Sequence, residues 1–156
     1  MDIEFVTENQ KRINKLISQY EKITRKLLDC DVDDILILTE KRKGISQEIT
    51  KLDNQIRNEC SEIPKALEAY LNKCDRSELT DDLKQVFDLR QEFNGIAFGI
   101  SSLDPEIIER INLIRDDLVI KIKKNNSGQN AKAAKYAKAG MSGGSNFFVP
   151  ENKKLI

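Results

Sequence analysis

The spacing of apolar residues between Ile35 and Ile56 limits what this chain can fold into more than any other feature. One line of residues recurs at alternating intervals of three and four: Ile35, Leu38, Arg42, Ile45, Ile49, Leu52 and Ile56. A side chain that returns about every 3.5 residues lies on one face of an α-helix and forms the seam of a coiled coil. In a strand, alternate residues would share a face instead. The spacing therefore predicts one long helix with a single packing face.

A preceding segment has the same spacing and predicts the partner of this helix. Its apolar residues are Ile13, Leu16, Tyr20, Ile23 and Leu27. Residues 7–10 form a capping-box pattern, so we expect this helix to begin at Thr7. The segment 29–31 interrupts the pattern, and Asp31 can cap the next helix, with Asp33 and Asp34 in its first turn. So short a connection places consecutive helices side by side and antiparallel.

Proline and acidic residues mark the later boundaries. At Pro64 the helix must stop or kink, and we expect a kinked continuation to about Cys74. After a polar loop, Thr80 opens a third helix, and the segment Asp104-Pro105-Glu106 predicts the start of a fourth that runs to about Lys124. Gly95 and Gly99 are interpreted as either a fraying helix end or a close approach of helices.

These elements predict an all-α fold. We expect a long, antiparallel, coiled-coil-like hairpin with two further helices packed as an elongated bundle over residues 1–124. Residues 125–156 are rich in Asn, Ser, Gly, Ala and Lys. Such a composition buries too little apolar surface to offset the entropy of ordering. This segment is expected to be a flexible, basic, low-complexity tail.

The composition excludes most catalytic chemistry. The chain has no histidine, which removes the commonest general base and most zinc sites. Its three cysteines are far apart and too few for a zinc site made of cysteines alone. It also contains neither a GxGxxG motif nor a P-loop. We therefore expect no enzyme, no cofactor and no metal.

The charges and the cysteines predict a cytoplasmic protein. Residues 125–156 hold five lysines and one glutamate, a net charge of +4, whereas residues 1–124 have a net charge of −4. Because no arginine cluster or basic stripe forms, we expect no nucleic-acid partner. No apolar run approaches the roughly 20 residues that a membrane span needs, and no secretory leader is evident. An odd number of cysteines fits a reducing compartment.

The fourth predicted helix is apolar on two sides, which is the strongest indication of function. One stripe consists of Ile107, Ile111, Ile114, Leu118 and Ile122, widened by Ile108 and Val119. Leu113 and Ile120 fall on nearly the opposite side. A helix with two apolar sides needs two neighbours. The helix is therefore either wedged inside the bundle or meets a partner helix, in which case Ile108, Leu113, Val119 and Ile120 are the candidate binding residues.

Two other positions are candidates for a contact. Arg42 is the one polar residue of its seam, and either its stem lies on the seam while its head reaches a carboxylate, or it sets register or contacts a partner. In the tail, Phe147 and Phe148 form an aromatic spot. They belong either to a solvated end or to a short recognition motif.

The hairpin resembles the bacterial flagellar export chaperones of the FlgN and FliT type. The resemblance lies in residues 20–28, which end in paired leucines, in the short acidic break, and in residues 35–56 with Glu40-Lys41-Arg42 and Leu52-Asp53. It covers about residues 10–124, and the Gly-Gly-Ser-Asn-Phe-Phe tail is more loosely similar. The family is helical and non-enzymatic and binds a client's C-terminal helical segment through its own C-terminal helices. No binding residue of the family maps securely onto this chain.

Two functions follow as expectations. In the first, the protein binds a hook-associated or filament-cap subunit and keeps this export client soluble. In the second, it is a structural coiled-coil or oligomerisation protein without an export client, and its surplus apolar side forms a homodimer.

Overall fold

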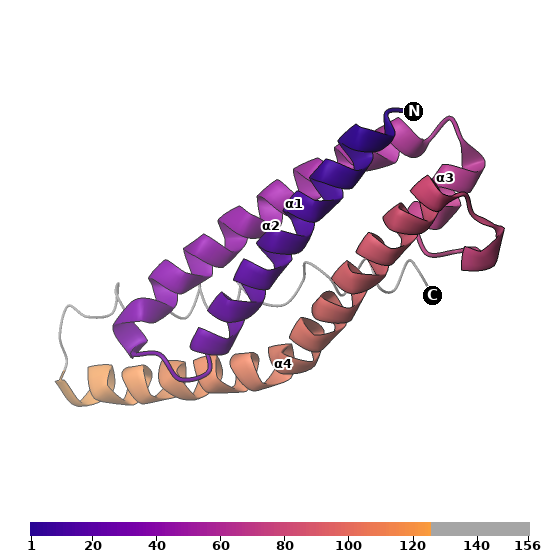
Figure 1. The fold of residues 1–156 in the computed structure, drawn as a ribbon. Helices are drawn as coiled ribbons and strands as arrows, with labels where there is room; N and C mark the ends of the chain where they lie inside the picture. Colours follow the sequence, from indigo (N-terminus) through magenta and orange to yellow (C-terminus); the bar gives the residue numbers. More distant parts are fainter. Residues whose placement is uncertain (126–156) are drawn as a thin grey trace. The chain divides into compact units, whose positions relative to one another are not determined.

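A computed structural model of the chain describes residues 1–125, and every regular element in that range is helical. The elements are α1 (Ile3–Lys26), α2 (Val32–Cys60), α3 (Pro64–Tyr70), a 3-10 turn η1 (Arg76–Glu78) and α4 (Asp81–Asn125). Figure 1 labels the four α-helices. The predicted all-α fold class is thus confirmed. The expectations for the tail, including those for Phe147 and Phe148, lie beyond the described residues.

The chain forms two compact units, which share α1, α2 and α4. Unit 1 consists of residues 1–20 and 45–98, and unit 2 consists of residues 21–44 and those from Gly99 onward. Each unit therefore combines one segment of each of the three long helices, and α3 and η1 belong to unit 1.

In unit 1, α1 and α2 run antiparallel, as the sequence predicts. The backbone N–H of Asp2 donates to Glu59 Oε1 at 2.6 Å, and Arg12 Nη2 pairs with Glu48 Oε1 at 3.1 Å. The core between the helices of this unit contains residues from all four helices. They include Val6, Ile13, Ile17, Tyr20, Ile49, Leu52, Ile56, Cys60, Ala66, Tyr70, Val86 and Phe93.

In unit 2, the connection between α1 and α2 lies against α4. Leu27 and Ile35 form one buried cluster with Ile107 and Ile111. The Arg110 guanidinium donates to the backbone carbonyls of Leu27 and Cys30. The last carbonyls of a helix have no partner within that helix. Arg110 therefore supplies donors to two carbonyls just beyond the C-terminal end of α1 and ties this connection to α4.

Two predicted boundaries near the ends of α1 and α2 are wrong. Helix α1 begins at Ile3, and Thr7 is not its cap: Thr7 Oγ1 donates back to the carbonyls of Ile3 and Glu4, at 2.9 and 3.1 Å. Helix α2 ends at Cys60 rather than continuing through a kink. Pro64 instead starts the separate helix α3, because proline is best tolerated in a first turn, where its missing N–H has no partner to lose.

The predicted break before Asp104 is also absent. Asp104 and Pro105 lie inside the single helix α4, which continues from Asp81 to Asn125. An internal proline removes one helical hydrogen bond and crowds the preceding turn. Here the Asp104 side chain is buried against Arg42, and Ile107 is buried one turn later. These tertiary contacts favour the continuous helix over the local stop signal.

Neither interpretation of Gly95 and Gly99 holds in the described part of the chain. Helix α4 continues through both residues, so they do not mark a frayed end. A Cβ atom added at either position would meet nothing within 4 Å, so no neighbouring helix approaches closely there. The two glycines thus lie on an open stretch of the helix surface.

Candidate protein-binding surface

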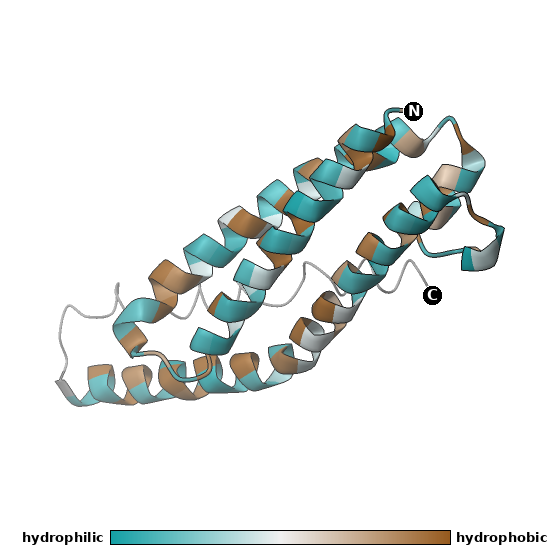
Figure 2. Ribbon diagram, in the orientation of Figure 1, coloured by the Kyte–Doolittle hydropathy of each residue, from teal (hydrophilic) through white to brown (hydrophobic). Residues whose placement is uncertain are grey.

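The C-terminal part of α4 presents the apolar residues that the sequence singles out. Ile108 is 40% exposed, Leu113 63%, Val119 40% and Ile120 53%. On the opposite side, Ile107 and Ile111 are buried, while Ile114, Leu118 and Ile122 are half-buried. No residue between Asn112 and Lys124 is fully buried. Figure 2 shows the apolar bands that continue along this part of α4.

The exposed residues fall on two sides of the helix. At about 100° per residue, Ile108 and Val119 flank the buried stripe, whereas Leu113 and Ile120 point away from it. We call the side around Leu113 and Ile120 the outer face; its other members are Glu109, Asp116, Asp117 and Lys124, all exposed. Within residues 1–125, Leu113 and Ile120 are thus not wedged between helices.

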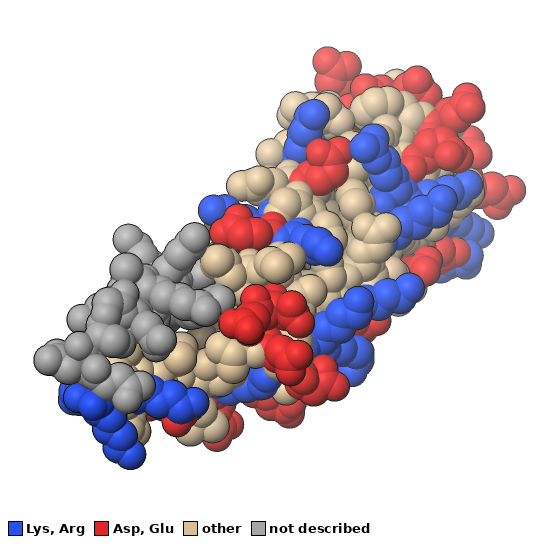
Figure 3. Space-filling view, turned by 90° about the vertical axis from the view of Figure 1, so that its left-hand side faces the viewer, with Lys and Arg blue, Asp and Glu red and all other residues tan. Residues whose placement is uncertain are grey.

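The charges of the outer face are partly paired within the helix. Asp116 Oδ1 lies 3.6 Å from Arg115 Nε, and Asp117 Oδ2 lies 3.0 Å from Lys121 Nζ. Glu109 and Lys124 make no ion pair in the described part of the chain. On the face of the molecule drawn in Figure 3, acidic and basic side chains are interspersed. Recognition of a partner would therefore depend on local charges such as these.

Arg42, the candidate polar contact of the α2 seam, is buried in unit 2. Its side chain is only 1% exposed, so its head does not reach solvent and cannot contact a partner directly in this structure. Nη1 donates to Thr24 Oγ1 at 3.3 Å and lies 3.9 Å from Asp104 Oδ1. Burial raises the pKa of the Asp104 carboxyl, and the charge of Arg42 opposes that rise. Arg42 therefore connects α2 with α1 and α4 inside the unit.

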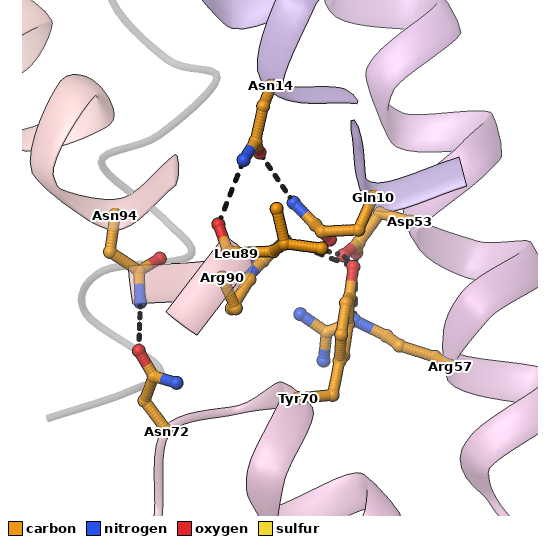
Figure 4. A network of polar contacts seen from close by, with 9 residues as sticks. All are labelled: Gln10, Asn14, Asp53, Arg57, Tyr70, Asn72, Leu89, Arg90 and Asn94. Atoms are coloured by element: carbon orange, nitrogen blue, oxygen red, sulfur yellow. Dashed lines mark hydrogen bonds and ion pairs between the residues drawn. The ribbon is translucent and has the colours of Figure 1, made fainter. Parts of the chain in front are cut away.

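Unit 1 contains a buried polar cluster that the sequence did not reveal (Figure 4). Tyr70 Oη donates to Asp53 Oδ1 at 2.5 Å, and Arg90 Nη1 lies 3.2 Å from the same oxygen. Arg57 Nε donates to the other carboxylate oxygen, Asp53 Oδ2, at 2.8 Å. The guanidinium of Arg90 also stacks on the rings of Tyr70 and Phe93, at 4.7 and 4.4 Å from their centroids. The cluster joins α2, α3 and α4.

This cluster is structural in character. Arg90 and Asp53 are buried, and burial raises the pKa of Tyr70 well above its usual range, so its hydroxyl stays protonated and donates. The signal for it in the sequence was Arg90, a charged residue on the otherwise apolar face of its helix. Its carboxylate partner comes from a different helix, which helical periodicity does not identify.

Asparagine and glutamine side chains extend the polar contacts across unit 1. Gln10 donates to Asn14 at 2.8 Å, and Asn14 donates to the backbone carbonyl of Leu89 at 3.0 Å. Asn72 adopts a positive φ of 55°, a conformation that asparagine tolerates better than most residues. Its amide bonds to Asn94 and to the carbonyl of Phe87, both at 3.2 Å. These bonds hold α1 and the end of α3 against α4.

Residues 1–125 contain no group of three or more acidic, cysteine or histidine side chains placed to hold a metal ion. Nor does any helix in this range have the length and apolar character to cross a membrane.

Comparisons with protein-family models, with curated proteins and with solved structures found no match for this chain. The exposed residues of α4 are therefore the main basis for a functional proposal.

Proposed function

We propose that this protein is a non-enzymatic binding protein that holds a helical segment of another protein against the C-terminal part of α4. The observation that carries the proposal is the exposure of Leu113 and Ile120, at 63% and 53%, in a helical stretch without a fully buried residue. An amphipathic helix is a suitable partner, since it can cover such apolar residues with its own apolar face.

The exposed area supports a transient complex. The four residues Ile108, Leu113, Val119 and Ile120 together expose about as much as two free aliphatic side chains, whose burial contributes about 3–6 kcal/mol. A micromolar complex needs about 8 kcal/mol, after the costs of association are met. The apolar contacts alone thus give weak binding, which suits a client that must later be released.

The resemblance to flagellar export chaperones gives the class of client. We propose that the client is a hook-associated or filament-cap subunit, kept soluble in the cytoplasm until export. This part of the proposal is supported by the residues of the hairpin that are similar to the family, within 20–28 and 35–56.

A capture experiment tests the proposal. The full chain is immobilised and offered purified hook-associated and filament-cap subunits, and one of them should be retained. Changing Leu113→Asp and Ile120→Asp together should abolish capture while circular dichroism shows an unchanged helical content. Ile37→Asp is the matched control, because Ile37 is 56% exposed but belongs to α2; capture should persist.

Two results would contradict the proposal at different levels. Capture by the folded double variant at the wild-type level would show that the outer face is not the binding surface. If the folded wild-type chain retains none of these subunits, the proposed class of client is wrong.

The alternative is an oligomerisation protein that has no export client and uses the same residues. An obligate dimer usually buries at least about 1,000 Å² per subunit, far more than these four side chains provide. Light scattering separates the two functions: a dimer that survives dilution would favour the alternative.

A further inference from the structure

The charged residues of the outer face of α4 are arranged symmetrically about its apolar pair. Glu109 precedes Leu113 by four residues, and Lys124 follows Ile120 by four residues. All four side chains are exposed. When the helix direction is reversed, Leu113 exchanges places with Ile120, and Glu109 exchanges places with Lys124. The outer face is therefore complementary to a second copy of itself in the antiparallel orientation.

We infer that two copies of this chain pair reversibly through their outer faces, with the two α4 helices antiparallel. Leu113 then packs against the partner's Ile120, and Glu109 faces the partner's Lys124. Two-fold symmetry repeats each contact once. The inference rests on the proposed function, in which Leu113 and Ile120 are the binding residues. A paired copy has both residues covered and must separate before a client can bind there.

Charge selects the antiparallel arrangement over the parallel one. A parallel pair would place Glu109 beside the partner's Glu109 and Lys124 beside the partner's Lys124, and like charges at such positions repel. In the antiparallel pair, Asp116 and Asp117 meet at the centre. Their repulsion is reduced because each has a cation within its own helix, Arg115 at 3.6 Å and Lys121 at 3.0 Å.

The pairing needs no rearrangement inside unit 2. Ile107 and Ile111, which pack against Leu27 and Ile35, lie on the side of α4 away from the outer face. The segment from Glu109 to Lys124 is about 22 Å long at 1.5 Å per residue. Because this contact is short, we expect the dimer to be weak and to depend on protein concentration.

Charge exchange at the paired positions provides the test. Sedimentation velocity over a concentration series should show the wild-type chain shifting from monomer towards dimer. At each end of the interface, Glu109→Lys alone places a lysine opposite the lysine of the second copy. Lys124→Glu alone places a glutamate opposite a glutamate at the same two ends. Each single variant should therefore weaken self-association at least tenfold. An equimolar mixture of the two variants restores both opposite-charge contacts and should associate as the wild type does.

Three outcomes would overturn the inference. They are a wild-type chain that stays monomeric at the highest concentration, single variants that associate as strongly as the wild type, or a mixture that associates no better than its components. Helical content, measured for every variant, shows that the fold is retained. None of these outcomes bears on client capture, which the Leu113→Asp and Ile120→Asp variant tests separately.

Discussion

Two arginines occupy positions where the helical repeat predicts an apolar residue. Arg42 and Arg90 are 1% and 4% exposed, and each lies near a buried carboxylate of another helix, Asp104 and Asp53 respectively. A buried charge is costly unless it is paired. Sliding α2 against α4 by one turn would separate these pairs. We infer that they align the two helices within their respective units.

The cluster around Arg90 leads to a stability prediction. Arg90→Met should lower the free energy of unfolding by about 3 kcal/mol, since it leaves the buried carboxylate of Asp53 without one of its cations. Arg57→Met is the control: the Arg57 side chain is 32% exposed, so its loss should cost less. Urea unfolding followed by circular dichroism measures both. Equal decreases in the free energy of unfolding would show that the deeper burial of Arg90 does not make it more important for stability than Arg57.

Two buried groups of unit 1 predict a loss of stability in alkali. Burial raises the pKa of Cys60 to about 11 and that of Tyr70 well above 10. In the unfolded chain both groups lose their protons at lower pH. The folded state then binds more protons, so the free energy of unfolding falls as pH rises.

The decline should begin near the pKa of an unfolded cysteine, about 8.5. The urea midpoint should therefore be lower at about pH 10.5 than at about pH 8. Cys60→Ala is the control, since removing the thiol should make the midpoint less dependent on pH. A midpoint that rises over this interval would contradict the burial of these groups.

At the scale of elements, tertiary contacts override several local signals. Helix α4 passes through Pro105 and contains Gly95 and Gly99, although each of these residue types weakens a helix interior. Buried residues within and just beyond this stretch, such as Ile100 and Ile107, stabilise the helical state. Helix α2 similarly continues through Gly44.

Gly44 offers a direct measure of what a glycine costs in these helices. It is exposed inside α2, and an added Cβ would meet nothing within 4 Å. Gly44→Ala should therefore raise the free energy of unfolding by about 0.5–1 kcal/mol, through the better helix propensity of alanine. Lys43→Ala, an exposed neighbour, should change it by less than about 0.5 kcal/mol. Destabilisation by Gly44→Ala in urea unfolding would mean that this position needs glycine for another reason.

At the scale of the whole molecule, stability is unevenly distributed along the chain. Both compact units have buried apolar cores, in which Ile56 and Val86 belong to unit 1 and Ile107 to unit 2. Between Asn112 and Lys124, α4 contributes no fully buried residue. A helical segment with few buried contacts opens more readily than a core. The candidate binding surface thus lies on the least anchored part of a long helix.

Hydrogen exchange should show this difference. Backbone amides of residues 113–124 should exchange at least tenfold faster than those of residues 86–97, which surround buried Val86, Phe93 and Ala97. Mass spectrometry of peptic fragments measures both ranges. Adding a captured client should slow exchange in residues 113–124 and leave residues 86–97 nearly unchanged. Equal exchange in both ranges of the free protein would contradict this distribution.

The sequence alone determined the features that depend on local geometry. Apolar spacing of three and four residues predicted helices, the acidic break at 29–31 predicted the connection of the hairpin, and the two-sided pattern singled out Leu113 and Ile120. These inferences work because helical periodicity relates residues within a few turns of each other. Whether those two residues bind a partner stays a prediction.

Only the tertiary structure decided which contacts form between distant residues. It placed Asp104 beside Arg42 and Asp53 beside Arg90, carried α4 through Pro105, and left the outer face of α4 exposed while its other side became core. Asp53 and Arg90 are 37 residues apart in the sequence, so the local spacing of residues does not show that they pair. Such pairs, and the side of a helix that is covered, depend on how whole helices pack.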